Sequence, residues 1–109
     1  MDIRELTLAD APQYQQLLHT AYRPVLELGI HFAAATADFA AIEQHLRCNL
    51  VYGVFFQGQL ACSVSLRLPW GNHPGPFGVP HIGWFATDPT FKRQGLAAKL
   101  LAWLEQHIL

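Results

Sequence analysis

The stretch ATDPTFKRQGLAAKLLAWLEQHIL, residues 86–109, is the most informative part of the chain, because it contains a turn, two cations and a helix start in that order. Gly95 opens a run whose apolar residues recur at helical spacing. The first turn of a helix has free backbone N–H groups and a partial positive charge, which stabilise an anion. A glycine there lets the backbone approach a phosphate closely, and Lys92 and Arg93 add charge. We interpret the stretch as a strand end, a phosphate-binding loop and a helix.

Two common phosphate-binding motifs do not fit this loop. A P-loop requires G-x-x-x-x-G-K-[ST], whereas Leu96 follows Gly95 and Thr90 stands five residues before it. The dinucleotide-binding fingerprint G-x-G-x-x-G is also missing from the stretch. The loop can instead turn its N–H groups inward as an anion-binding nest, which predicts a phosphate or pyrophosphate ligand of another kind.

Composition excludes several classes of protein. The 109 residues are enough for one domain. Charged residues are 14% of the chain, against about 25% in typical soluble domains, so we expect a partner, such as a second copy, or further chain to cover apolar surface. The net charge of -1 argues against nucleic acid as a partner. No apolar run reaches the ~18 residues of a membrane helix, and the charged N-terminus is unlike a signal peptide.

The cysteines and histidines predict neither a disulfide framework nor a metal site. Cys48 and Cys62 have no metal-ligand spacing. Two thiols in a domain of this composition are typical of reduced, buried residues in a cytoplasmic protein. The six histidines show no H-x-x-x-H pairing, so no metal is expected.

Periodicity and turn residues predict a mixed α/β (α+β) domain over residues 1–109, with the order β-α-α-β-β-β-α around a largely antiparallel sheet. Thr7 and Asp10 form a capping box before the first helix, and Arg23-Pro24 should end that helix. Thr36 is the expected cap of the second helix. The expected elements are a strand at 2–8, a helix up to 23, a loop with a short helical turn over 23–36, a helix after 36, a hairpin of strands 50–56 and 60–68, a strand at 81–87 and a helix at 95–109.

The second strand of the hairpin has the clearest pattern. Its apolar residues alternate with smaller or polar ones with a period of two. The residues expected on one face are Leu60, Cys62, Val64, Leu66 and Leu68. The loop after it, residues 69–80, is rich in Gly and Pro, which excludes regular structure there.

The residues KRQGLA, 92–97, resemble the cofactor loop of the GNAT family of N-acetyltransferases, which has the form Q/R-x-x-G-x-G/A between a strand and a long helix. Lys92 stands in the Gln/Arg position, which departs from the pattern but keeps a hydrogen-bond donor. Gly95 and Ala97 match the other two positions. The expected order of elements also resembles the family over the whole chain, whereas the motif covers only residues 82–101.

This resemblance implies that acetyl-CoA is the co-substrate and that an amine attacks its thioester directly. In the family, main-chain groups at the end of the strand pair with the pantetheine arm like an added strand, and a backbone N–H there stabilises the oxyanion. The amine must be neutral, so a base or a water chain takes its proton. The cofactor-binding residues that the resemblance implies are Phe85, Ala86, Thr87, Lys92, Arg93, Gln94, Gly95, Leu96, Ala97 and Ala98.

Family members usually continue beyond this helix with further strands and a helix, which complete the cofactor cleft. The resemblance therefore indicates the N-terminal part of an acetyltransferase domain. An alternative of a different class stays open at this point: a domain that binds acetyl-CoA, or a partner subunit, without catalysis. The acceptor is also open, and a peptide N-terminus, lysine, polyamine, aminoglycoside or amino acid would each provide a primary amine.

Candidates for the remaining roles are few. His81 and Asp88 are candidates for a catalytic base, although a strand-edge histidine and a turn cap are the commoner roles of such residues. Tyr22 and Glu27 are expected in the loop between the first helices, where the family admits its acceptor. The loop residues Trp70, His73 and Phe77 could line an acceptor pocket, although packing is the commoner role.

Overall fold

The computed structural model describes residues 1–69, 78 and 80–109. Its centre is an antiparallel sheet in the order β1-β2-β3-β4. The strands are β1 (Asp2–Glu5), β2 (Leu50–Phe56), β3 (Gln59–Arg67) and β4 (His81–Thr87). The hairpin β2–β3 lies within one residue of the range expected from its β-branched and aromatic residues, because Gly58 in the turn adopts the left-handed φ of 82° that glycine allows.

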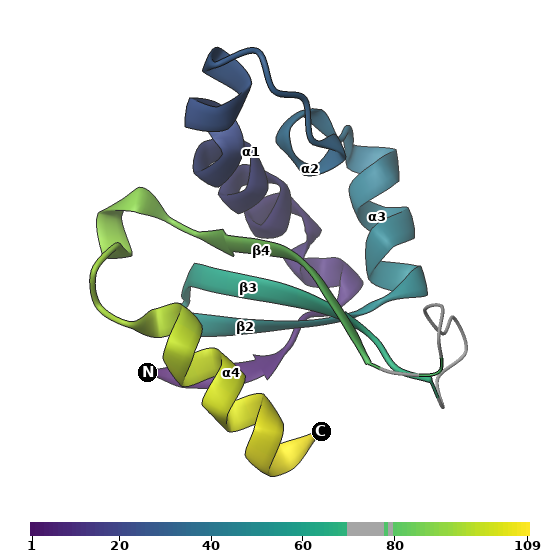
Figure 1. Cartoon of the computed structure of the whole chain (residues 1–109), viewed down its shortest axis with the longest axis vertical. Helices are drawn as coiled ribbons and strands as arrows, with labels where there is room; N and C mark the ends of the chain where they lie inside the picture. Colours follow the sequence, from purple (N-terminus) through teal and green to yellow (C-terminus); the bar gives the residue numbers. More distant parts are fainter. Residues whose placement is uncertain (70–77, 79) are drawn as a thin grey trace.

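Helices cover both faces of this sheet (Figure 1). The helices α1 (Ala11–Glu27), α2 (Ala33–Thr36) and α3 (Phe39–Cys48) lie on one face, and α4 (Leu96–His107) lies on the other. Because successive strand residues point to opposite faces, the structure has two hydrophobic clusters. The first cluster, against α1 and α3, contains Leu6, Ala11, Tyr14, Leu17, Leu18, Ala34, Ala37, Ile42, Val51, Phe55, Leu60 and Ala86.

The second cluster lies between the sheet and α4. Leu96, Leu100 and Leu104 recur every four residues of α4 and are each at most 2% exposed, which gives the helix its buried stripe. The strand residues that they face are Tyr52, Val54, Ala61, Cys62, Val64 and Leu66. Burying both faces explains why β2 and β3 are almost continuously apolar instead of alternating with charged residues.

The prediction for the face of Leu60 is wrong. Leu60 pairs with Phe55 and Cys62 pairs with Val54, so Ala61 is an extra residue in β3. Such a bulge reverses the direction of the side chains beyond it. Leu60 therefore joins the cluster against α1, whereas Cys62 and its followers face α4.

The predicted end of the first helix is also wrong. α1 continues through Pro24 to Glu27, although proline removes one helical hydrogen bond. Tertiary contacts hold this last part of the helix: the Tyr22 hydroxyl donates to the carbonyl of Phe85 at 2.7 Å, and its ring packs against Phe32 at 5.9 Å. The avoidance of helix before a proline is a local preference, and packing overrides it here.

The predicted cap of the next long helix is wrong as well. Thr36 ends the short α2, and Asp38 caps α3 by accepting the backbone N–H of Ala41 at 2.8 Å. The short helical turn expected in this region is confirmed as α2. Nearer the N-terminus, the Asp10 carboxylate accepts the backbone N–H of Thr7 at 2.8 Å, which confirms the interaction of a capping box.

Arg4 fixes the position of Asp10 by two hydrogen bonds of 2.8 and 2.9 Å. These bonds, mainly, lower the pKa of the Asp10 carboxyl group. The guanidinium of Arg4 also lies 4.1 Å from the centre of the Phe55 ring, which ties the start of α1 to β2. In the part of the chain that the structure describes, no helix is both long and apolar enough to cross a membrane.

Two serines on β3 provide a matched test of the packing against α1 and α3. Ser63 and Ser65 are both buried, but the Ser63 hydroxyl has no hydrogen-bond partner within the described residues. The Ser65 hydroxyl meets both Tyr14 and His45. A buried hydroxyl without a partner costs free energy that an alanine does not.

We expect Ser63→Ala to raise the free energy of unfolding by about 1 kcal/mol, and the melting temperature by roughly 4–8 °C. Ser65→Ala should lower both, since it leaves two polar partners unpaired. Thermal unfolding followed by circular dichroism measures the two variants under one condition. A decrease of equal size in both would contradict the difference in their hydrogen bonding.

Candidate functional site

The loop that enters α4 has an open, left-handed backbone. Gly95 precedes the helix with φ 69° and ψ 24°, and Arg93 has a φ of 67°. The first helical hydrogen bond to form runs from Lys99 N to Gly95 O at 3.0 Å, so the N–H groups between them have no partner along the helix. Gly95 has no side chain to cap them, and a Cβ built there would meet nothing within 4 Å. The space beside Gly95 is thus open, and the N–H groups of residues 96–98 have no partner along the helix.

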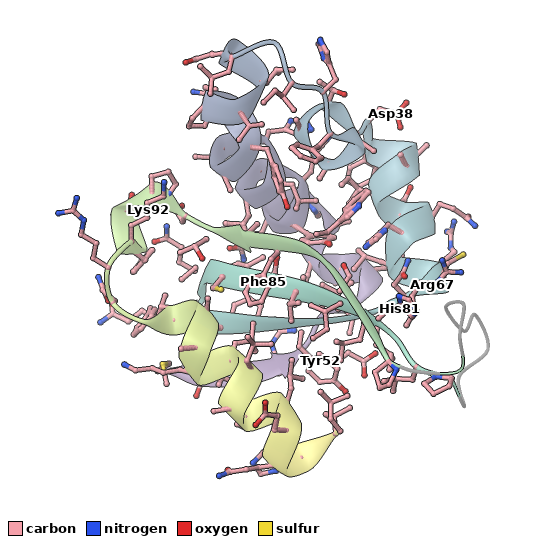
Figure 2. All side chains as sticks on the ribbon, viewed as in Figure 1. Asp38, Tyr52, Arg67, His81, Phe85 and Lys92 are labelled. Atoms are coloured by element: carbon pink, nitrogen blue, oxygen red, sulfur yellow. The ribbon has the colours of Figure 1, made fainter. Side chains whose placement is uncertain are left out.

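The side chains around this turn differ in exposure. Lys92, Arg93 and Gln94 are exposed, and Lys92 lies at the outer side of the loop (Figure 2). Leu96 is buried against the sheet and Ala97 packs beside it, whereas Ala98 is exposed. The side chain of Leu96 therefore anchors the helix to the sheet.

Asp88 connects β4 to this loop. Its carboxylate accepts the backbone N–H of Thr90 at 2.8 Å and caps the short 3-10 helix η3 (Pro89–Phe91). Its own N–H donates to the carbonyl of Ala61 at 2.8 Å. Asp88 thus has a defined structural role at the strand end.

β4 contains a bulge directly before this end. Ser63 lies opposite Ala86 and Ser65 lies opposite Gly83, so two residues of β4, Trp84 and Phe85, face one residue of β3. Trp84 has a φ of 47°, an unusual conformation for a bulky residue. The bulge turns the backbone of Phe85 away from β3.

Two candidates from distant parts of the sequence meet at this bulge. The Tyr22 hydroxyl donates to the Phe85 carbonyl, and burial raises the pKa of this phenol, which keeps it a donor. Because the Asp88 N–H faces β3 and backbone groups alternate along a strand, the N–H of Thr87 lies on the outer edge with the Phe85 carbonyl. Ala86 is 3% exposed and packs inward. The Thr87 hydroxyl lies 3.5 Å from the Cys62 sulfur.

A buried polar network lies beside the bulge, and the sequence reasoning did not predict it. The His45 ring stacks on Trp84 with centroids 3.8 Å apart and planes 5° apart. His45 Nε2 lies 2.6 Å from the Ser65 hydroxyl, which lies 3.2 Å from the Tyr14 hydroxyl. The Asn49 amide nitrogen lies 3.3 Å from His45 Nδ1, which favours the tautomer with the proton on Nε2.

Burial, and then the positive charge of Arg67, lower the pKa of His45 to about 4. The imidazole is therefore neutral at physiological pH. Both ring nitrogens already have partners, and a base with so low a pKa is a weak proton acceptor. His45 positions Trp84 rather than transferring a proton. Burial raises the pKa of Tyr14 still more strongly, so that phenol stays protonated.

Two grooves meet at the His45–Trp84 stack. The polar groove, of about 300 Å³, is lined by His45, Asn49, Ser65, Arg67, His81, Ile82, Gly83 and Trp84. The apolar groove, of about 540 Å³, is lined by Ala33, Thr36, Ala37, Ala41, Gln44, His45, Cys48, Asn49 and Trp84. Both are large enough for part of a small molecule.

Of the remaining candidate residues, some line these grooves and others do not. His81 lines the polar groove. Glu27 is exposed at the end of α1 and lines neither groove. Tyr22 and Glu27 both belong to α1 and not to a loop. Trp70, His73 and Phe77 lie outside the described residues.

A signal for the missed network was present in the sequence. His45 follows Ile42 by three residues, so both lie on the buried face of one helix. Ser65 was expected on the less apolar face of its strand, but α1 and α3 cover that face. Within residues 1–69, 78 and 80–109, no group of three or more His, Cys, Asp or Glu side chains could hold a metal ion.

Comparisons with known proteins match the chain to acetyltransferases. Residues 10–109 match the Acetyltransferase (GNAT) family. The chain is 47% identical over 100 residues to an S-(2-succino)cysteine N-acetyltransferase of Bacillus subtilis (strain 168), covering 92% of this chain and 61% of the relative. It is 29% identical over 106 residues to an S-alkylcysteine N-acetyltransferase of the same organism, covering 97% and 60%. The chain thus spans about three fifths of the length of each relative.

The fold is also that of solved acetyltransferases. The structure superposes on PaiA N-acetyltransferase from Thermoplasma acidophilum, crystallised in complex with coenzyme A, with a TM-score of 0.69. The match covers 96% of this chain and 69% of the other, at 12% identity. The predicted mixed α+β fold with an antiparallel sheet is confirmed.

The low pKa of His45 predicts how stability depends on pH. The ring takes up a proton near pH 6.5 when unfolded and near pH 4 when folded. Between these values the unfolded state binds more protons, so stability falls as the pH decreases from about 6.5 toward 4. Urea unfolding midpoints from pH 7 to pH 4.5 measure this loss. The urea midpoint of His45→Gln should decrease less over the same pH range than that of the wild type. If the midpoints of both proteins decrease equally with pH, the assignment of a buried neutral imidazole is contradicted.

Proposed function

The chain belongs to the GNAT acetyltransferase family, and we propose that it transfers an acetyl group from acetyl-CoA to the α-amino group of an S-substituted cysteine. The observation that carries the proposal is the open turn at Gly95, eight residues after the end of β4, which is an edge strand of the sheet. A diphosphate and the arm attached to it need these two features next to one another. The names of the two Bacillus subtilis relatives supply the acceptor class.

Main-chain groups carry most of the cofactor contacts in this proposal. The pyrophosphate accepts the N–H groups of residues 93–98, with Lys92 and Arg93 adding charge. The pantetheine arm pairs with the outer edge of β4 at Phe85 and Thr87. Ala86, whose main chain lies in register with Ser63 of β3, contributes by keeping the strand close-packed.

The chemistry is one substitution at the thioester. The neutral amine forms a bond to the acetyl carbon, the carbon–sulfur bond breaks, and the thiolate of coenzyme A leaves and takes up a proton. A backbone N–H on the outer edge of β4 is suited to stabilise the oxyanion. His81 is the candidate to receive the proton from the amine, through water in the polar groove, whereas Asp88 is already used as a cap.

A second function is favoured by one observation, the coverage of about three fifths of each relative. Residues 1–109 would then be part of a domain that binds acetyl-CoA and gains its catalytic groups from another segment or subunit. Other amine acceptors, including peptides, a homo-oligomeric state and a cytoplasmic location stay predictions.

An assay of coenzyme A release tests the proposal. The protein is incubated with acetyl-CoA and, in separate reactions, S-(2-succino)cysteine, S-ethylcysteine, spermidine and an aminoglycoside. We expect release with at least one of the two cysteine derivatives and little with the polyamine or aminoglycoside. Binding of acetyl-CoA without release in any reaction would support the second function instead.

Gly95→Glu tests the cofactor site. A carboxylate at this turn repels a diphosphate, so acetyl-CoA should no longer raise the melting temperature of Gly95→Glu. At a hundredfold excess over Kd, acetyl-CoA should raise the free energy of unfolding of the wild-type protein by about 2.7 kcal/mol. Gly95→Ala is the matched control, because alanine has the same left-handed backbone strain without the charge.

We expect Gly95→Ala to retain much more of the thermal shift than Gly95→Glu. Circular dichroism checks that both variants are folded. Equal stabilisation of Gly95→Glu and wild type by acetyl-CoA would place the cofactor elsewhere on the molecule.

A further inference from the structure

The polar groove has an uneven distribution of charge. Its lining residues come from α3, β3 and β4, and they include Arg67 and His81 but no Asp or Glu within the part of the chain that is described. Arg67 and His81 lie at the same end of the sheet, where β3 and β4 pair (Figure 2). An anion entering this groove therefore meets positive charge and hydrogen-bond donors.

The shifted pKa of His45 also indicates a positive electrostatic potential in this groove. After burial, the charge of Arg67 is the cause that lowers the pKa of His45, so the potential of this side chain reaches the floor of the groove. The floor itself is neutral, because His45 carries no charge at physiological pH. Asn49 donates its amide hydrogens to the carbonyl and to Nδ1 of His45, so the group there that can donate to a ligand is the Ser65 hydroxyl.

The groove lies next to the point at which acetyl transfer is proposed. Gly83 and Trp84 form part of its wall, and Phe85, the next residue, turns its carbonyl to Tyr22 on the outer edge of β4. Consecutive Cα atoms are about 3.8 Å apart. The wall of the groove therefore begins one residue from the proposed point of transfer, and Arg67 pairs with His81, four residues before Phe85.

We propose that the polar groove binds the carboxylate groups of the acceptor's sulfur substituent, with Arg67 forming the ion pair and the Ser65 hydroxyl adding a hydrogen bond. This inference rests on the proposed function. Such a groove makes the chain selective for cysteines with an anionic substituent on sulfur. The 2-succino group has two carboxylates, which a guanidinium binds through paired N–H groups.

The apolar groove on the other side of the His45–Trp84 stack offers a contrasting environment. Its lining includes three alanines, Trp84 and the half-buried Cys48, which suit an uncharged alkyl group. A chain that selects alkyl substituents would therefore use this groove, and its affinity would not depend on Arg67.

The experiment compares two acceptors that differ in the charge of the substituent, S-(2-succino)cysteine and S-ethylcysteine. We expect Arg67→Gln to raise the KM for the succino compound by roughly tenfold to a hundredfold, and to change the KM for S-ethylcysteine and for acetyl-CoA by less than about threefold. Arg67→Lys should recover part of the loss, because it restores the charge without the paired geometry.

Arg47→Gln is the matched control, because Arg47 is an exposed arginine in the last turn of α3 and is not among the residues lining the polar groove. It removes the same charge and should change neither KM by more than about threefold. An equal rise for both acceptors in Arg67→Gln, or an equal effect of the two arginine variants, would overturn the inference.

A second readout needs no turnover and separates this inference from the proposed function. Succinate should raise the melting temperature of the wild type more than that of Arg67→Gln at the same concentration. If neither cysteine is acetylated but succinate shows this difference, the proposed function fails and the anion-binding groove stands. If succinate stabilises both proteins equally, the inference fails whatever the activity assay shows.

Discussion

The stacking of His45 on Trp84 is the interaction on which the site depends. Trp84 holds a left-handed backbone, which costs roughly 1–3 kcal/mol in a residue with a side chain. The imidazole lies 3.8 Å from the indole and is itself held by Ser65 and Asn49. The bulge that turns Phe85 outward is therefore maintained by α3 and β3, and the geometry of the site requires both to be in place.

The sheet divides the proposed reaction between its two faces. On the face of α4 lies the turn at Gly95, to which the proposal assigns the diphosphate. On the opposite face, the polar and apolar grooves lie between α3 and β4. The outer edge of β4 is the place where the two meet, because Phe85 and Thr87 turn backbone groups toward it. Because helices cover both faces of the sheet, the proposed binding sites of acetyl-CoA and the acceptor lie on different faces.

Local patterns predicted the elements whose residues interact with near neighbours in the chain. The capping interaction of Thr7 with Asp10 spans three residues, and the β2–β3 hairpin needs only a glycine turn and two apolar strands. Predictions failed where distant residues changed a local preference. Tyr22 holds α1 past Pro24 by its bond to Phe85, and the extra residue Ala61 moves Leu60 to the other face. Neither the Tyr22–Phe85 hydrogen bond nor the bulge at Ala61 can be recognised from the residues of its own segment.

The order of elements, the loop before α4 and the need for a glycine at residue 95 follow from the sequence, because these depend on backbone conformation and short-range spacing. Which polar residues come together beside β4 follows from the tertiary packing. His45, Ser65 and Trp84 come from three elements up to 39 positions apart, and each is an ordinary residue in its own segment. Their roles arise from burial and mutual contact, which exist only once α3, β3 and β4 are packed together.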